Sequence, residues 1–228
     1  MNANALYLLI LLMFIVSLIV QGSVSSKFKK YSQVPVSGGM SGFEAARKIL
    51  ESAGLDDVKI EMTHGMLSDH YDPMHKTLRL SEAVYKSASV AAVSVAAHEA
   101  GHALQHAEGY KPLMIRTSSV FMANFGSRLS WPIFLLGLLL GFPSLVYAGI
   151  ALYVLIVLFT LITLPVEFNA SSRAMNQMTA NGILSVSEKP MARDMLSTAA
   201  MTYVVSAVSA ILQLLRLIAI AQGNKRRD

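Results

Sequence analysis

The amino-acid sequence predicts a mainly α-helical, multi-pass membrane protein with a small α+β portion outside the bilayer. The chain has 228 residues, of which 54% are hydrophobic and only 14% are charged, and its mean hydropathy is +0.49. This composition is too apolar for an ordinary soluble domain. Long uncharged runs alternate with polar stretches, and one of these stretches carries both helical and strand-like patterns.

The first uncharged run covers residues 5–24 and is just long enough to span a bilayer. A cleaved signal peptide is the alternative, but no positive segment precedes the run and no convincing small-x-small cleavage site occurs before Lys27. We therefore expect residues 1–26 to form a transmembrane anchor. Lys27, Lys29 and Lys30 follow the run directly, so the positive-inside rule places the N-terminus outside and the next segment in the cytoplasm.

Residues 27–117 form a polar, mixed stretch, which we expect to be the first half of the α+β portion. Ser41 and Glu44 have the spacing of a capping box. They predict a helix that runs to about Ser52, with Gly54 as its C-cap.

Two short strands are predicted after this helix, at residues 58–62 and 76–81, and residues 64–73 between them are rich in turn formers. The second strand lies shortly before the next helix. If it is an exposed edge strand, it can hydrogen-bond the extended backbone of a peptide. A purely structural strand is an equally good interpretation.

A further helix is predicted within residues 91–109, which are rich in alanine and other good helix formers. Ser87 or Ser89 can cap its start, and Gly109 lies where a C-cap glycine is expected.

His98, Glu99 and His102 form an H-E-x-x-H motif in this helix. Two imidazoles four residues apart lie one turn apart on the same helix face, close enough to bind one Zn²⁺. Glu99 is rotated by about 100° from His98, which places it to accept a proton from metal-bound water instead of binding the metal. The motif predicts a hydrolase, typically of peptide bonds. Two surface histidines on an ordinary helix are the alternative.

A second hydrophobic region, residues 118–164, is too long for one span. Residues 141–144 (Gly-Phe-Pro-Ser) break it near its middle. We therefore predict a transmembrane hairpin whose first helix ends near Leu140 and whose second helix covers residues 145–164.

Glu167 follows the hairpin and is the best candidate for a third zinc ligand. The chain has no cysteine, so a metal must be bound by histidines and carboxylates, and a catalytic zinc needs three protein ligands. A two-span hairpin returns the chain to the side of the membrane that it left, so Glu167 and the motif helix share one side. An interfacial carboxylate near a helix N-terminus is the alternative for Glu167 alone.

Residues 165–197 are expected to complete the α+β portion with a polar helical segment that is interrupted at Gly182 and Pro190. Residues 198–228 contain a last hydrophobic run and a basic tail. Residues 199–221 have two interpretations. A fourth span places the tail outside, against the positive-inside rule, whereas a helix in the interface or packed on the domain keeps it inside.

Four other histidines are candidates for accessory roles. His106 lies about 12 Å along the helix axis from His98, too far to share its metal, and can face substrate or surface. His64, His70 and His75 lie in or beside the loop before the second strand. One of them could stabilise a tetrahedral intermediate, and a structural role in the loop is the alternative.

The chain resembles the YugP-like neutral zinc metallopeptidases of bacterial membranes along nearly its whole length. The matching blocks, in order, are SGFEAARKIL, LSDHYDP, LRLSEAVY, VAAHEAGHALQHAEGY, LPVEFNASSRA and TYVVSAVSAILQLLRL. The segment at Glu167 also resembles the E-x-x-A-D block of the HtpX and CAAX prenyl protease type of membrane gluzincin, which implies that Glu167 is the third ligand. Ser171 stands where those enzymes have Asp, so the resemblance implies weaker orientation of a ligand histidine.

We therefore expect a membrane-bound zinc metalloendopeptidase of the gluzincin type, with a zincin-like catalytic portion made of the motif helix and a short sheet. The expected cofactor is Zn²⁺, and the expected partners are the lipid bilayer and peptide or membrane-protein substrates. The chain has no aromatic and basic interleaving of the RNA-binding kind, so no nucleic-acid partner is expected. The expected location is the bacterial inner membrane, with the active site on its cytoplasmic face.

A non-catalytic membrane scaffold that retains a zinc-binding helix is the alternative function. The presence of Glu99 favours catalysis, because a structural zinc site needs no base and is usually closed by a fourth protein ligand.

Overall fold

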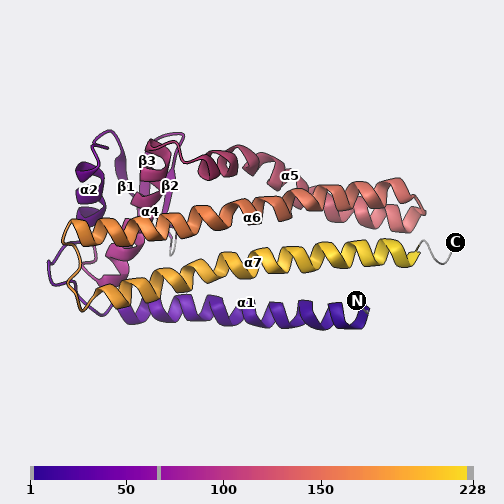
Figure 1. Ribbon diagram of the computed structural model, residues 1–228, viewed down its shortest axis with the longest axis horizontal. Coiled ribbons are helices and arrows are strands. Elements are labelled where there is room, and N and C mark those ends of the chain that lie inside the picture. The colour runs from indigo at the N-terminus through magenta and orange to yellow at the C-terminus, as the bar shows by residue number, and fades with distance from the viewer. Residues whose placement is uncertain (1–2, 66–67, 225–228) are drawn as a thin grey trace. The chain divides into compact units, whose positions relative to one another are not determined.

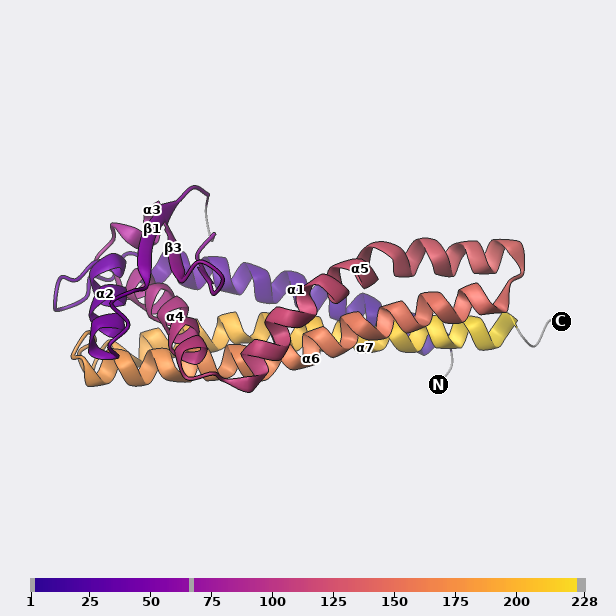
Figure 2. The ribbon, with the colours of Figure 1, turned by 90° about the horizontal axis from the view of Figure 1, so that it is seen from above.

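The computed structural model describes residues 3–65 and 68–224 (Figures 1 and 2). The elements in this part of the chain are α1 (Ala3–Tyr31), α2 (Gly42–Ser52), β1 (Lys59–Thr63), β2 (His70–Asp72), β3 (Thr77–Ser81), α3 (Glu82–Tyr85), α4 (Val90–Ala107), α5 (Lys111–Leu140), α6 (Pro143–Ala180) and α7 (Lys189–Asn224).

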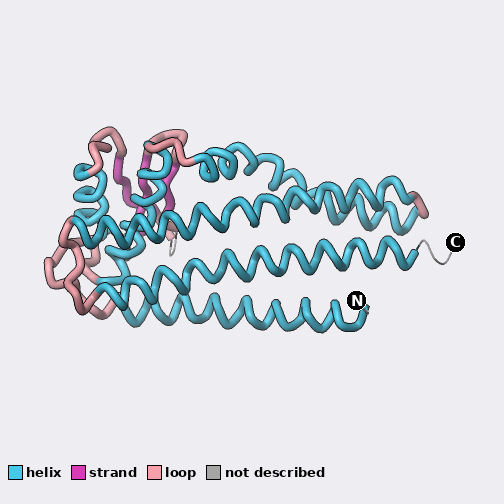
Figure 3. The backbone as a smooth tube through the Cα atoms, in the orientation of Figure 1, coloured by secondary structure: helices cyan, strands magenta, loops and turns pink. Residues whose placement is uncertain are grey.

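The chain divides into two compact units, which are described separately. The helical unit comprises Met1–Ile19, Met114–Pro165 and Thr202–Asp228, and the mixed unit comprises Val20–Leu113 and Val166–Met201. Helices make up most of both units, and the strands in the described residues all belong to the mixed unit (Figure 3). The expected division of the chain at residues 26, 117, 164 and 197 stays a prediction.

The helical unit is built from parts of α1, α5, α6 and α7, and each of these helices is long and apolar enough to cross a membrane. Large apolar side chains such as Leu8, Phe14 and Leu139 are exposed on it, as expected for surfaces that face lipid. A small core joins α5, α6 and α7 through Phe134, Val146, Leu217 and Ala221. The prediction of a mainly α, multi-pass membrane protein with a small sheet is confirmed.

The predicted hairpin is present, and its first helix ends at Leu140 as expected. The prediction that its second helix ends at residue 164 is wrong, because α6 continues through Pro165 to Ala180. A proline removes one backbone hydrogen bond inside a helix. Beyond Pro165, however, the buried residues Val166, Ala170, Ala174 and Met178 recur every four positions, and the packing of this stripe stabilises the continued helix.

The last helix is also longer than predicted. A polar segment ending near residue 196 and a separate run at residues 199–221 were expected, but α7 joins both in one helix. Pro190 is its second residue and does not interrupt it, because a proline is tolerated in the first turn. The length and composition of α7 suit a fourth span.

The mixed unit contains a three-stranded sheet in the order β1-β3-β2, in which β1 pairs parallel and β2 antiparallel to β3. The interpretation of residues 76–81 as an exposed edge strand is wrong, because β3 is the central strand. β2 lies within the stretch that was expected to be a loop. It has only three residues, too few for an alternating pattern to be recognised in the sequence.

The capping signals for α2 are confirmed. The Ser41 hydroxyl accepts a hydrogen bond from the Glu44 amide at 3.3 Å, and the Glu44 carboxylate accepts one from the Ser41 amide at 2.7 Å. The C-cap itself is Ala53 and not Gly54. Gly54 follows it with a φ of 69°, which favours glycine. α2 packs on α4, and its buried residues join the core of the mixed unit beside β3, whose Leu78 and Leu80 are fully buried.

Candidate metal site

α4 carries the motif residues and is held on several sides. Its N-cap is Ser89, which accepts a hydrogen bond from the Ala92 amide at 3.3 Å, so Ser89 and not Ser87 has the capping role. Gly109 has a φ of 64° just after the helix, as predicted. Gly101 allows close approach of α6, because a Cβ atom there would lie 2.6 Å from the carbonyl oxygen of Ala170.

This close approach brings Glu167 of α6 to His98 and His102 of α4. Glu167 Oε2 lies 3.2 Å from His98 Nε2 and 3.6 Å from His102 Nε2. One ligand atom from each of the three residues lies within 4.8 Å of the others. The two imidazole rings are almost perpendicular, at 84°, with their centroids 4.8 Å apart.

The residues present fit a zinc ion. Ligand atoms about 2.0–2.1 Å from a tetrahedral zinc lie roughly 3.3 Å from one another, and the two distances to Glu167 bracket this value. Two imidazoles and one carboxylate are a ligand set of catalytic zinc sites, which keep their fourth position open. The side chains of His98, His102 and Glu167 are 16%, 10% and 2% exposed, so the cluster is largely buried and His98 is its most exposed member.

Residues around the cluster hold the far side of each imidazole. His102 Nδ1 lies 3.0 Å from Gln105 Oε1, and His98 Nδ1 lies 3.2 Å from the Ser171 hydroxyl. Gln105 is fully buried and also donates to Asn169 Oδ1 at 2.9 Å. Sequence reasoning missed Gln105 and Asn169. The spacing of three residues between His102 and Gln105 was the available signal, whereas nothing local indicated the partner on α6.

Burial and charge act on His102 in opposite directions. Burial alone lowers the pKa of the His102 imidazole. The hydrogen bond to Glu167 and the charge of Glu99 outweigh this effect, so the pKa lies above its ordinary value. Glu99 is half-buried and lies next to His98 in sequence. Its negative charge favours the protonated form of His102.

Among the described residues, the metal-ligand cluster consists of His98, His102 and Glu167, and the other four histidines are not part of it. His106 Nδ1 lies 2.9 Å from the Tyr71 hydroxyl, beside a cavity of about 230 Å³. The accessory role proposed for His106 stays a prediction.

The three loop histidines have local partners or are exposed. His70 Nδ1 lies 2.8 Å from the carbonyl oxygen of Ser68, and His75 Nδ1 lies 2.7 Å from a carboxylate oxygen of Asp72. His64 is exposed. Accessory roles for these three residues also stay predictions.

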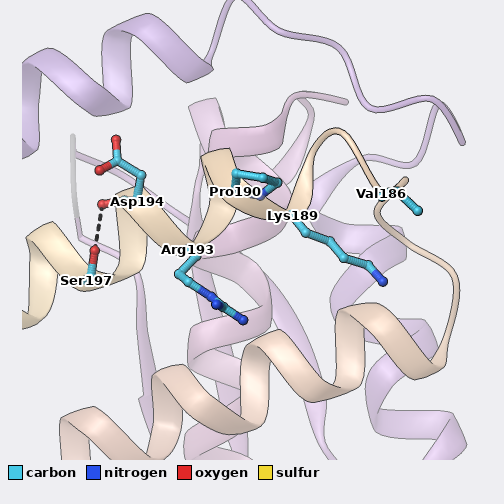
Figure 4. Close-up of a pocket in the computed structure, with 6 residues that line it drawn as sticks. All are labelled: Val186, Lys189, Pro190, Arg193, Asp194 and Ser197. Atoms are coloured by element: carbon cyan, nitrogen blue, oxygen red, sulfur yellow. Dashed lines mark hydrogen bonds between the residues drawn. The ribbon is translucent and has the colours of Figure 1, made fainter.

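A second hollow, of about 450 Å³, lies at the start of α7 (Figure 4). It is lined by Val186, Lys189, Pro190, Arg193, Asp194 and Ser197. Asp194 pairs with Lys27 at 2.6 Å and accepts a hydrogen bond from the Tyr31 hydroxyl at 2.7 Å. None of these residues belongs to the metal-ligand cluster, so this hollow is separate from the candidate site.

The cluster joins His98 and His102 of the H-E-x-x-H helix α4 with Glu167 of α6, in a chain with four candidate spans, and this combination is typical of a membrane metallopeptidase. The chain belongs to the family described as "Putative neutral zinc metallopeptidase", whose model matches residues 6–222.

A curated relative supports this class. The chain is 47% identical over 200 residues to "Putative membrane protease YugP" of Bacillus subtilis (strain 168), and the match covers 88% of this chain and 89% of that protein. No solved structure matches the chain.

Proposed function

We propose that this protein is a membrane-bound zinc metalloendopeptidase of the gluzincin type. The observation that carries the proposal is the convergence of His98, His102 and Glu167, whose ligand atoms lie within 4.8 Å of one another although Glu167 is 65 or more residues away in sequence. Family membership and the relative's name support the same activity.

Each residue of the motif has a separate task in this proposal. His98, His102 and Glu167 would hold the metal. A zinc ion held there would supply Lewis-acid activation of a water molecule and of the scissile carbonyl group. Glu99 accepts the proton of that water and donates it to the leaving amine. Glu99 suits the role of proton acceptor because it follows the ligand His98 directly in the helix and is rotated away from the ligand position.

The proposed location is the bacterial inner membrane, with the site on the cytoplasmic side. The cluster lies in the mixed unit, and Lys27, Lys29 and Lys30 of the same unit lie at the C-terminal end of α1, the first candidate span. The positive-inside rule favours the cytoplasm for these lysines. The proposed substrates are peptides or membrane proteins close to the bilayer, because the site belongs to a chain that is held in the membrane.

Substitution of the base is the direct test. Glu99→Gln keeps the ligands but removes the proton acceptor, so it should reduce peptide hydrolysis by at least about 100-fold, the low end for general-base catalysis, while zinc stoichiometry stays at the wild-type value. Removing zinc with a chelator should have the same effect, and adding it back should restore hydrolysis. Proteomic comparison of membranes carrying wild type and Glu99→Gln identifies the substrates that accumulate.

The same experiment distinguishes the enzyme from a non-catalytic scaffold. Full hydrolysis by Glu99→Gln or by zinc-free protein contradicts the proposal. Glu167→Ala should lower zinc affinity if Glu167 is a ligand. Wild-type zinc binding by Glu167→Ala would favour a scaffold whose metal does not use this residue.

A further inference from the structure

A continuous hydrogen-bond chain connects His102 of α4 with α6 in the mixed unit. Beyond the His102–Gln105 contact, Gln105 Nε2 donates to the carbonyl oxygen of Val166 at 2.8 Å and to Asn169 Oδ1 at 2.9 Å. Asn169 Oδ1 also accepts a hydrogen bond from Arg173 Nε at 2.7 Å. Neither Gln105 nor Asn169 is a ligand in the proposed zinc site.

The direction of every hydrogen bond in this chain is determined by two groups that have only one role. A guanidinium only donates, so the Asn169 atom that faces Arg173 is the oxygen. A backbone carbonyl only accepts, so the Gln105 atom that faces Val166 is the nitrogen. The oxygen of the Gln105 amide therefore faces His102. The hydrogen-bond partners determine this orientation, which the shape of the amide group alone would leave ambiguous.

The remote end of the chain is anchored on both helices. Arg173 on α6 binds the two carboxylate oxygens of Glu108, the C-cap of α4, at 2.5 and 2.8 Å. The guanidinium also lies 5.9 Å from the ring centroid of Tyr110. Because Arg173 is held by these partners, Asn169 is held in turn, and the Gln105 amide has one orientation.

We infer that Gln105 is a positioning residue that keeps His102 in the Nδ1–H tautomer. Its oxygen can only accept, so Nδ1 of His102 carries the proton that is donated to it. Nε2 faces Glu167, where the ligand atoms converge, and is the nitrogen left for the metal. In many metal sites a carboxylate fixes the tautomer and the orientation of a ligand histidine. The neutral amide of Gln105 has this role for His102 and adds no negative charge to the buried cluster. This inference rests on the proposed zinc site.

The test measures zinc binding instead of peptide hydrolysis. The full chain in detergent, in a Glu99→Gln background that removes hydrolysis, is titrated with zinc against a chromogenic chelator. Gln105→Leu should lower zinc affinity by about 10- to 100-fold, the usual effect of losing a partner of a ligand histidine. Asn169→Leu removes one of the two acceptors of the Gln105 amide and should lower affinity by about threefold, the effect of one net hydrogen bond.

Two control variants separate positioning from folding. Asn169→Asp keeps the accepting oxygen and should retain wild-type affinity. Gln177→Leu removes a glutamine side chain of α6 that accepts a hydrogen bond from Asn181, just after the end of the helix, and should also retain wild-type affinity. The thermal midpoint of each zinc-free variant shows whether the protein is folded.

A second readout reports the tautomer directly. In zinc-free protein with ¹⁵N-labelled histidine, Nδ1 of His102 should carry a proton in wild type and Asn169→Asp, whether or not Nε2 also carries one. This signal should be lost in Gln105→Leu. A folded Gln105→Leu with wild-type zinc affinity overturns the inference. If Gln105→Leu does not fold, wild-type affinity in Asn169→Leu overturns it. Wild-type protein that binds no zinc contradicts the proposed function instead, and the tautomer signal then decides the inference alone.

Discussion

His98 and His102 present equivalent nitrogens to Glu167, but their rings are supported differently. The partner of His102 is an amide oxygen that only accepts, whereas the partner of His98 is the Ser171 hydroxyl, which can donate or accept. The tautomer of His98 is therefore less firmly determined than that of His102. Ser171 is also the position at which the sequence departs from the E-x-x-A-D block that it resembles.

Ser171→Asp should strengthen zinc binding. A carboxylate at this position only accepts, so it selects the Nδ1–H tautomer of His98 and raises the basicity of the ligand nitrogen. We expect an increase in zinc affinity of about 10-fold, measured by competition with a chelator. Ser172→Asp places the same charge on the exposed neighbouring residue and is the control. Equal affinities of wild type and Ser171→Asp would show that Ser171 does not limit the site.

The raised pKa of His102 predicts opposite pH dependences for the zinc-free and zinc-bound protein. A group whose pKa is higher in the folded than in the unfolded state stabilises the fold at low pH and loses this contribution as pH rises through the folded pKa. The zinc-free protein should therefore become less stable as pH rises above about 6.5, the ordinary histidine value. Zinc requires neutral imidazoles, so the stabilisation by zinc should increase over the same range.

Thermal unfolding with and without zinc checks this prediction. The measurements run from about pH 6 to about pH 9, a range that begins just below the ordinary histidine pKa and extends above it. His102→Gln removes the titrating group and should flatten the zinc-free profile. A zinc-free protein that becomes more stable over this range would contradict the role given to His102.

At the scale of elements, the site depends on the contact between α4 and α6. Glu167 lies on the buried stripe of α6 together with Val166 and Ala170, and Gly101 on α4 lets this stripe approach the motif. The distance between the helices, and not the motif alone, determines whether three ligand atoms converge.

Gly101→Ala should separate the two helices. Its Cβ would lie 2.6 Å from the Ala170 carbonyl oxygen, which is backbone and cannot move independently of α6. We expect a loss of about 1–3 kcal/mol in the free energy of unfolding, the usual cost of overpacking, and weaker zinc binding. Thermal unfolding and chelator competition measure the two effects. Gly22→Ala on α1 is the control, because a Cβ there meets nothing within 4 Å, and it should not reduce stability.

At the scale of the whole molecule, the number of spans determines which segments share a side of the membrane. Four helices are candidates to cross a membrane. The motif helix and Glu167 are separated in sequence by α5 and by the part of α6 that precedes Glu167. An even number of crossings is required for the His-His-Glu cluster, and the presence of all three residues in the mixed unit agrees with it.

Cysteine labelling can test this topology, because the natural chain has no cysteine. Single variants Lys48→Cys in α2, Phe142→Cys in the hairpin turn and Gly223→Cys near the end of α7 are exposed to a membrane-impermeant maleimide on intact cells. Phe142→Cys and Gly223→Cys should be labelled, and Lys48→Cys only after permeabilisation. The wild type is the blank. Labelling of Lys48→Cys on intact cells would reverse the proposed orientation, and protection of Gly223→Cys alone would show that α7 does not cross.

Much of the architecture follows from local sequence signals. The capping box of Ser41 and Glu44, the cap at Ser89 and the glycines after α2 and α4 involve residues within five positions of one another, so their geometry is dictated by the helical backbone. The hairpin follows equally from the length of the apolar run and its break at residues 141–144. These predictions agree with the structure because no distant partner is needed for them.

Only the tertiary structure decided the features that depend on distant contacts. β3 is a central strand because β1 and β2 flank it, and α6 continues past Pro165 because its buried stripe packs in the mixed unit. Gln105 meets Asn169 across 64 positions of sequence. The sequence determined the H-E-x-x-H helix and the side chain types around it. The packing of α4 on α6 determined which of those side chains reach the metal ligands, since helical periodicity sets a face but not its partner.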